Sequence, residues 1–376
     1  METNPKLAGD HVLQNLQNIC PPHMKGAHDS DFLIHGGKAY IVYMANDERL
    51  GEQPDWPFVY NALTIVDLAS NRVEKTVTFA ASQMQYANET LPVGACFVPR
   101  IVQKDARTLR CFFTSEDIGK RQSQYWRTDY DIERGEFDRQ IHRVELETAQ
   151  GVFPMQPIHL HNHAKAEGFV GTEPTHGLYI HGNHKVFDGR LHAVLIVFPE
   201  GPMALASLND EMTRYTVRGT FFRPVGAWLN EAAVNRMPDG SFLAISREEK
   251  QGQNYMFATS PDGCTWSDHQ YRDMVPNGTS SKPLLECFGG VYYLGWNEAT
   301  RVNGASRSVF NIDVSRDGKT WTRKYRFETE RSFQYPGLQE YRGTIYMSVT
   351  QGQRTDDHHS GKQRIMFGQL GAVRQA

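Results

Sequence analysis

Glu231 and Arg247 are an acid and a base placed symmetrically about a turn in the stretch LNEAAVNRMPDGSFLAISR. The turn, PDG at 238–240, combines a proline that fixes φ with a glycine that accepts positive φ. The flanking residues predict short strands, and an antiparallel hairpin brings the two side chains together at its open end. There a carboxylate can transfer a proton and a guanidinium can bind another carboxylate. The alternative is a surface ion pair, which stabilises a fold only slightly.

Chemically active side chains recur at the same distance before other turns of this kind. The residues seven or eight positions before six such turns are His28, Phe97, His181, Glu231, Ser281 and Tyr335. Loops expected at the same ends of the strands add Asp55 and Arg307, and the segment HLHNH adds His161 and His163. Four of the six positions hold residues that transfer protons or act as nucleophiles. We therefore predict that these side chains converge on one rim, although each alone is more typical of a structural role.

The elements that must position these residues are hairpins, and the hairpins repeat. Their turns lie at Gly36–Gly37, near Asp105, and at Asp188–Gly189, Asp239–Gly240, Gly289–Gly290 and Arg342–Gly343. The last four are 51, 50 and 53 residues apart, and helical periodicity is hard to find. This period predicts an all-β chain, a β-propeller of six blades, with room for a seventh between residues 105 and 188. We expect one domain over residues 1–376, in which residues 1–27 pack on the propeller or close its last blade.

Composition excludes several classes of protein. The chain has 376 residues, a net charge of −3 and 39% hydrophobic residues, unlike basic nucleic-acid binders and disordered acidic chains. No apolar run reaches 18 residues, so no membrane helix is predicted. The five cysteines are odd in number and contain no CxxC, which excludes a disulfide framework or a cysteine zinc site. Free thiols suit a reducing compartment, whereas enzymes that degrade polysaccharides are often exported, so the location stays open.

Two short motifs give a first resemblance. SPDGCTW (260–266) and SRDGKTW (315–321) share the pattern S-x-D-G-x-T-W, in which Ser and Asp can close a turn and Trp can pack between sheets. They resemble the Asp-boxes of the sialidase superfamily of β-propellers. The resemblance covers residues 28–350 and implies a sialidase-like fold.

The same resemblance implies roles for individual residues. It casts Tyr335 in QYPGLQEYRGTIYMSV as the nucleophile and Glu231 as its acidic partner. Arg247 and Arg307 look like two of the three arginines that bind the substrate carboxylate. Asp55, after NDERLGEQP, looks like the general acid. A departure is His28, which stands where the family has its first-blade arginine.

The histidines suggest a different branch of the superfamily. His161, His181 and the downstream Arg247 resemble the pattern of propeller-type ulvan lyases and rhamnosyl-glucuronate lyases. The resemblance implies β-elimination at a uronic acid, in which a base removes the C5 proton while a cation neutralises the carboxylate. The family's tyrosine, sixteen positions before the arginine, is Glu231 here, so Tyr335 or a protonated Glu231 would supply the proton. Related propeller α-L-rhamnosidases cleave the same kind of linkage with one histidine, for which His28 is the candidate.

The segment HLHNH has a second interpretation. His159, His161 and His163 alternate, so an extended strand would place them on one face. Together with His181 or His184 they could hold zinc, and packing or solvent exposure is a third possibility. No cofactor is required by either sugar-cleaving reaction.

The first hypothesis for function is an enzyme that cleaves a glycosidic bond at a uronic acid by β-elimination, with His161, His181, Glu231 and Tyr335 catalytic. His28, Asp55, Arg247 and Arg307 would then bind the substrate. A sialidase-like or rhamnosidase-like hydrolase is the alternative, and a non-catalytic carbohydrate-binding propeller is the third. In each case the expected partner is an acidic oligosaccharide or polysaccharide, not a nucleic acid or a membrane.

Overall fold

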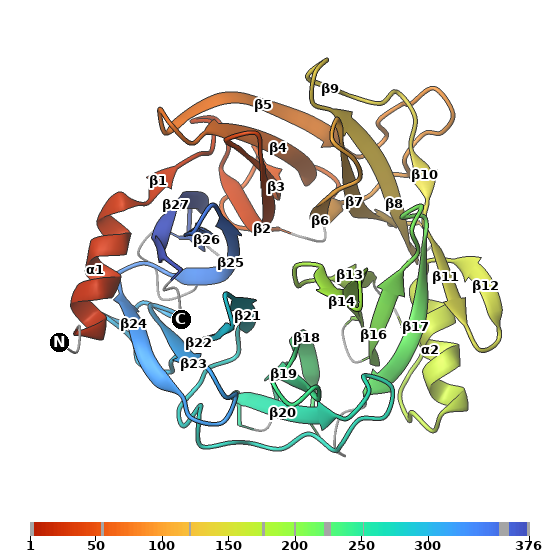
Figure 1. The fold of residues 1–376 in the computed structure, drawn as a ribbon. Coiled ribbons are helices and arrows are strands. Elements are labelled where there is room, and N and C mark those ends of the chain that lie inside the picture. Colours follow the sequence, from red (N-terminus) through yellow and green to blue (C-terminus); the bar gives the residue numbers. More distant parts are fainter. Residues whose placement is uncertain are drawn as a thin grey trace. The chain divides into compact units, whose positions relative to one another are not determined.

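The computed structural model describes residues 4–53, 56–119, 122–174, 177–198, 201–221, 227–250, 252–352 and 361–373, and most of these lie in strands (Figure 1). They fall into two compact units. The first comprises residues 1–28, 49–51 and 223–376, and the second comprises residues 29–48 and 52–222. The described strands form six sheets.

The first unit contains three antiparallel sheets whose strands mostly follow one another along the chain. One consists of β18 (Leu229–Arg236), β19 (Phe242–Glu248) and β20 (Tyr255–Ser260). The next consists of β21 (Leu284–Phe288), β22 (Val291–Asn297), β23 (Val309–Ser315) and β24 (Thr322–Glu328). The third consists of β25 (Phe333–Tyr341), β26 (Thr344–Gln351) and β27 (Arg364–Ala372), and β1 (Gln17–Asn18) completes it by pairing with β27.

The second unit also has three sheets. The first is β2 (Gly26–His35), which begins in the first unit, with β3 (Lys38–Asn46), β4 (Tyr60–Asp67) and β5 (Arg72–Ala80). The next is β6 (Cys96–Gln103), β7 (Thr108–Asp117) and β8 (Gln122–Asp131), with β9 (Glu136–Phe137) and β10 (His142–Arg143) on β8. The third has β13 (Leu178–Ile180), β14 (Lys185–Phe187), β15 (Arg190–Val197), β16 (Met203–Leu208), β17 (Arg214–Phe221), β11 (Glu145–Thr148) and β12 (Gly151–Pro154).

All six turns predicted from the sequence join two strands of one sheet. They connect β2 to β3, β6 to β7, β14 to β15, β18 to β19, β21 to β22 and β25 to β26. The glycines at these turns take positive φ, for example 88° at Gly240, which a residue with a Cβ rarely adopts. Turn chemistry therefore identified the hairpins correctly.

Both S-x-D-G-x-T-W motifs fold as hydrogen-bonded turns. In the second, the Ser315 hydroxyl donates to Asp317 (2.9 Å), and the same carboxylate accepts from the backbone N–H groups of Lys319 and Thr320 (2.8 and 2.7 Å). These bonds lower the pKa of the exposed Asp317 below its usual value. Trp321 packs on the core between the β18–β20 and β21–β24 sheets, near Met237 and Leu285.

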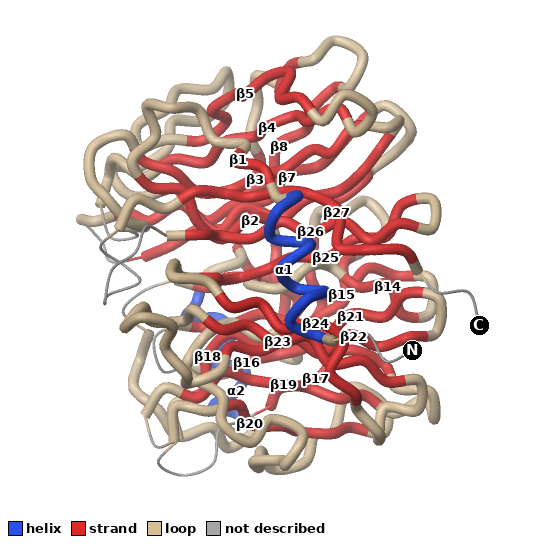
Figure 2. The backbone as a smooth tube through the Cα atoms, turned by 90° about the vertical axis from the view of Figure 1, so that its left-hand side faces the viewer, coloured by secondary structure: helices blue, strands red, loops and turns tan. Residues whose placement is uncertain are grey.

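The described ranges contain two helices, although helical periodicity is hard to find in the sequence. α1 (Pro5–Asn15) is capped by the Asn4 side chain and packs on β24 and β27, as Figure 2 shows. α2 (Pro157–Ala166) packs on β11 and β15. It contains HLHNH, so the interpretation of that segment as an extended strand is wrong. None of the helices in the described ranges is both long and apolar enough to cross a membrane.

Candidate functional site

Two candidate catalytic residues sit at β-bulges on the first strands of their sheets. The register of β18 shifts between Asn230 and Ala232, which leaves Glu231 bulged with a φ of 42°. The register of β25 shifts between Gln334 and Gly337, and Tyr335 takes a φ of 55°. Bulges re-aim a side chain, and a non-glycine residue in this region costs about 1–3 kcal/mol. Backbone strain of this kind is typical of functional sites.

The two bulged side chains meet within the first unit. The phenolic O–H of Tyr335 donates a short hydrogen bond to Oε1 of Glu231. Nη1 of Arg247 donates both to Oε2 of Glu231 (2.7 Å) and to the phenolic oxygen (3.0 Å). Glu231 is 3% exposed and Tyr335 is 6% exposed. The phenolic hydrogen therefore points at a carboxylate that can accept it, while a cation lies beside the oxygen that would become negative.

Arg247 is held by several partners. Besides the two bonds of Nη1, its Nε donates to the Ser280 hydroxyl (2.8 Å), and Nη2 forms an ion pair with Glu249 (2.7 Å). Burial by itself lowers the pKa of Arg247, but the negative charges of Glu231 and Glu249 raise it above the ordinary value. The sequence prediction that Glu231 and Arg247 are neighbours agrees with this geometry.

Further groups surround Tyr335. The ring of His28 lies 4.4 Å from the Tyr335 ring, centroid to centroid. Nζ of Lys282 lies 5.0 Å from the centroid of the Tyr335 ring, and the guanidinium carbon of Arg307 lies 6.0 Å from it. Arg307 is fixed by a hydrogen bond from Nη1 to the Gln334 side chain (2.9 Å). We call Tyr335, Glu231, Arg247, His28, Lys282 and Arg307 the tyrosine cluster.

The neighbouring first strands of the sheets explain why these residues gather. β21 contacts both β18 and β25, and Lys282 lies two residues before β21 (Figure 1). Arg307 precedes β23, and its backbone carbonyl accepts from the N–H of Phe333 at the start of β25 (2.8 Å). Glu231 and Tyr335 therefore face each other from first strands that share a neighbour.

A second polar group lies in the second unit. Asp29, with a φ of 49°, accepts from Nη2 of Arg100 (2.8 Å), and Nδ1 of His181 lies 3.3 Å from the same oxygen, Oδ2. Asp29 and Arg100 are fully buried, and His181 is 9% exposed. The Tyr179 ring packs against His181 at 5.5 Å and against Phe97 at 5.0 Å. A carboxylate at Nδ1 orients an imidazole so that Nε2 can transfer a proton. We call Asp29, Arg100 and His181 the histidine group.

The histidines of HLHNH do not form the predicted array. Side chains two positions apart on an α-helix point about 200° apart, so His159, His161 and His163 do not share a face. His159 stacks on Phe153, and His163 contacts Gln150 (3.2 Å) and Glu167 (3.3 Å). The alternation argument for zinc therefore fails. Within the described ranges, no group of three His, Cys, Asp or Glu side chains is placed to hold a metal ion.

His161 packs as a core residue of α2. Its side chain is fully buried, its two ring nitrogens have no hydrogen-bond partner among the described residues, and its ring meets Phe169 edge-on at 5.8 Å. Burial and then the charge of Lys165 lower its pKa, so the ring is neutral at pH 7. These contacts give no support to its predicted partnership with His181, which lies just after β13.

The remaining predicted positions are less informative. Asp55 lies outside the described residues. Phe97 belongs to an apolar cluster with Tyr179 and Val98. Ser281 is fully buried.

Sequence reasoning missed Lys282, Glu249, Asp29 and Arg100. Lys282 is the immediate neighbour of the predicted Ser281, and Asp29 follows the predicted His28, which itself lies beside Tyr335. No pattern in the sequence marks the bulges that orient Glu231 and Tyr335.

Comparison with known proteins identifies the fold. No protein-family model and no curated protein sequence matches the chain. A protein of unknown function from Dyadobacter fermentans superposes with a TM-score of 0.63 at 12% identity, covering 96% of this chain and 98% of the other. The sialidase of Trypanosoma rangeli superposes with a TM-score of 0.63 at 10% identity, covering 95% of this chain and 57% of the other. The NanB sialidase of Streptococcus pneumoniae superposes with a TM-score of 0.59 at 12% identity, covering 95% of this chain and 70% of the other. The chain therefore has the sialidase-like, all-β propeller fold predicted from its sequence.

Proposed function

We propose that this protein is a carbohydrate-active enzyme that hydrolyses the glycosidic bond of an acidic sugar, with Tyr335 as the nucleophile. The observation that carries the proposal is the buried contact of the Tyr335 hydroxyl with Glu231 and Arg247. A nucleophile within hydrogen-bond reach of its base, which is in turn oriented by a third group, is the signature of covalent catalysis.

The chemistry follows from the direction of the hydrogen bonds. Glu231 accepts the phenolic proton while the Tyr335 oxygen bonds to the anomeric carbon and the bond from that carbon to the leaving oxygen breaks. The leaving oxygen takes a proton from a general acid, for which Asp55 remains the candidate. Water then attacks the anomeric carbon and gives a proton to the carboxylate left by the general acid, while the bond from that carbon to the Tyr335 oxygen breaks and this oxygen takes back the proton held by Glu231. Arg247 stabilises the oxygen of Tyr335 through the N–H that it donates.

The charge of the tyrosine cluster supports an acidic substrate. A neutral phenol activated by a base approaches a centre that carries a carboxylate more easily than an anionic nucleophile would. Arg307 offers a planar fork that suits a carboxylate. Two structural neighbours are named as sialidases, one of them in complex with sialic acid.

The histidine group favours a second candidate, β-elimination at a uronic acid. His181, oriented by Asp29 (3.3 Å), has the arrangement of a general base that can remove the proton next to a carboxylate. Elimination also needs a cation at that carboxylate and an acid for the leaving oxygen.

One assay separates hydrolysis, elimination and binding. The protein is incubated with sialosides, ulvan and gum arabic while released sugars and absorbance near 235 nm are recorded. Released sugar without absorbance supports hydrolysis. Released sugar with rising absorbance, from the unsaturated uronate, supports elimination instead. Binding of one of these glycans without turnover would contradict both and support a lectin.

Variants assign the chemistry to one group or the other. For hydrolysis, Tyr335→Phe should lower kcat at least about a hundredfold, because the nucleophile is lost, whereas His181→Ala should retain activity. For elimination, His181→Ala should be the more severe change. Melting temperatures close to that of the wild type would show that the fold is intact.

A further inference from the structure

Lys282 is a buried lysine against the face of the proposed nucleophile. It is 6% exposed, and its Nζ lies 5.0 Å from the centroid of the Tyr335 ring. Arg307 lies 6.0 Å from the same centroid. An ammonium is a compact, strongly hydrated charge, and removing it from water is costly unless the surroundings stabilise it. Lys282 therefore places a positive charge beside a tyrosine that is already hydrogen-bonded to a base.

The interaction between these groups depends on the protonation of Tyr335. A cation over a neutral phenol is attracted only by the quadrupole of the ring. When the phenol gives up its proton, the ring and oxygen carry a full negative charge and the attraction to the ammonium grows. A cation within about 4–6 Å favours the charged form of an acid.

We propose that Lys282 is a positioning residue that makes Tyr335 a stronger nucleophile, by stabilising the negative charge its oxygen gains as the proton moves to Glu231. This inference rests on the proposed role of Tyr335. The charged and titratable groups described around the phenol are Glu231 from β18, Arg247 from β19, His28 from β2 and Arg307 from the loop before β23. A negatively charged Glu231 opposes the ionisation of Tyr335, whereas the neighbouring cations favour that ionisation.

The test measures ionisation of Tyr335 without any substrate. The protein is labelled with 3-fluorotyrosine, and its ¹⁹F NMR spectrum is recorded from pH 6 to pH 10.5. The resonance of Tyr335 is the one missing from Tyr335→Phe. In Lys282→Met we expect the midpoint of its titration to rise by about one pH unit or more, because the cation is lost. Lys282→Arg should restore the midpoint to within a few tenths of the wild-type value.

A matched control comes from the same unit. Nζ of Lys324 lies 5.2 Å from the centroid of the Tyr293 ring, so Lys324→Met removes a lysine over a different tyrosine. It should leave the Tyr335 midpoint unchanged. If Lys282→Met does not fold, Lys282→Gln takes its place in the comparison.

An unchanged midpoint in the folded Lys282 variant would overturn the inference, and so would a wild-type resonance that does not titrate below pH 10.5. These outcomes differ from failure of the proposed function, which would show as no sugar release by the wild type. In the pH profile of a hydrolysed substrate, Lys282→Met should shift the limb assigned to Tyr335 in the same direction as the midpoint.

Discussion

The hydrogen bonds of Arg247 limit how it can bind a substrate. The sequence resemblance suggested that Arg247 binds the substrate carboxylate. In the structure, however, Nε donates to Ser280 and the two N–H groups of Nη1 donate to Glu231 and Tyr335. One N–H of Nη2 is used by Glu249. A substrate carboxylate would reach it through the other N–H of Nη2 or by displacing Glu249. Glu249 therefore competes with the substrate carboxylate for Arg247.

Glu249→Gln should improve binding of an anionic substrate. The substitution keeps the shape of the side chain but removes the charge that pairs with Arg247 at 2.7 Å. We expect KM to fall about three- to tenfold, the effect of about 1 kcal/mol, with little change in kcat. Steady-state kinetics on the cleaved glycan give both constants. Glu74→Gln, which breaks the surface pair with Lys38, is the control, and a higher KM in Glu249→Gln would contradict the competition.

At the scale of elements, the sequence predicted the hairpins correctly but did not predict the helix α2. Turn residues such as Gly240 act locally, so their effect can be read without knowing the rest of the fold. The alternating histidines of HLHNH suggested an extended strand as one interpretation. The buried positions Pro157, Leu160, His161 and Ala164 instead follow the spacing of a helix that begins at a proline.

The same locality explains the errors in the candidate site. Alternation along a strand fails at a bulge, where one extra residue reverses the direction of those beyond it. Alternation also ends where a strand ends: Ser281 was chosen in place of Lys282 by counting back from Gly289–Gly290, and both residues lie before β21 begins at Leu284. The pairing of Glu231 with Arg247 was predictable, because both lie on one hairpin. Their meeting with Tyr335, 104 positions after Glu231, required the packing of three sheets.

Gly9→Ala should loosen α1 from β24. A Cβ on Gly9 would lie 2.1 Å from the backbone oxygen of Arg326, which cannot move without disturbing the strand. Alanine favours a helix by about 1 kcal/mol over glycine, but overpacking of this kind costs about 1–3 kcal/mol. We therefore expect a lower melting temperature by calorimetry. The exposed Gln14→Ala is the control, and a Gly9→Ala protein as stable as the wild type would show that α1 adapts.

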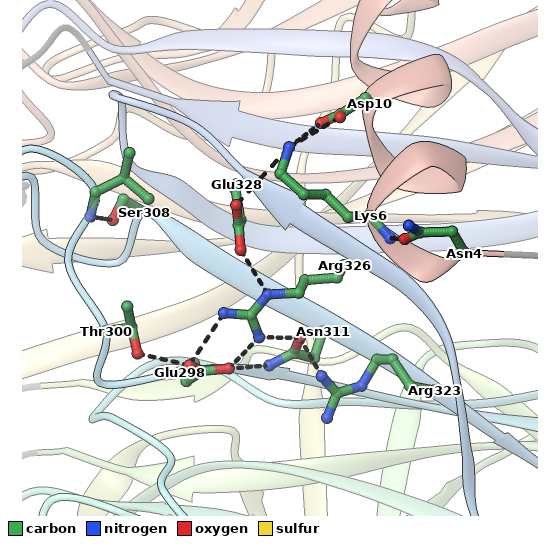
Figure 3. Close-up of polar contacts among 11 residues, drawn as sticks. Asn4, Lys6, Asp10, Glu298, Thr300, Ser308, Asn311, Arg323, Arg326 and Glu328 are labelled. Carbon is green, nitrogen blue, oxygen red and sulfur yellow. Dashed lines mark hydrogen bonds and ion pairs between the residues drawn. The ribbon is translucent and has the colours of Figure 1, made fainter.

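A network of charges on β23 and β24 should make stability depend on pH. Glu298 accepts from Arg326, Thr300 and Asn311, as Figure 3 shows. Burial raises the pKa of Glu298, but these hydrogen bonds outweigh burial and lower it to about 2. The stabilisation is fully present above the ordinary value of about 4.5 and is lost as pH falls toward 2.

Glu298→Gln tests that network. At pH 7 it should lower the free energy of unfolding by about 3 kcal/mol, and the difference from the wild type should shrink as pH falls from 4.5 toward 2. Urea denaturation at several pH values gives this difference. A difference that stays constant over that range would assign the stability to something other than the charge of Glu298.

At the scale of the whole chain, the N-terminal segment belongs to the last sheet. Gln17 pairs with Phe367, and Val12 of α1 and Leu16, which follows that helix, are buried in the core that contains Phe327 and Phe333. The sequence expectation was that residues 1–27 pack on the propeller or close its last blade, and no local feature of the segment chose between the two. Long-range pairing of this kind is invisible to local patterns.

Removal of residues 1–18 should therefore weaken the sheet formed by β25, β26 and β27. The edge of β27 would lose its partner, and an unpaired edge promotes association between molecules. We expect a lower melting temperature and larger species in size-exclusion chromatography. A synthetic peptide of residues 4–25 should reverse both effects, whereas removal of residues 1–3 should have neither.

The pairing of β1 with β27 also means that the last sheet can be completed only late in synthesis. Phe367 follows Gln17 by 350 positions, and ribosomes add about 5–20 residues per second. The N-terminal strand therefore waits roughly 20–70 s for its partner to be made. During that interval the apolar side of α1 has no completed core to cover. We expect the nascent chain to depend on chaperones until β27 has been synthesised and can pair with β1.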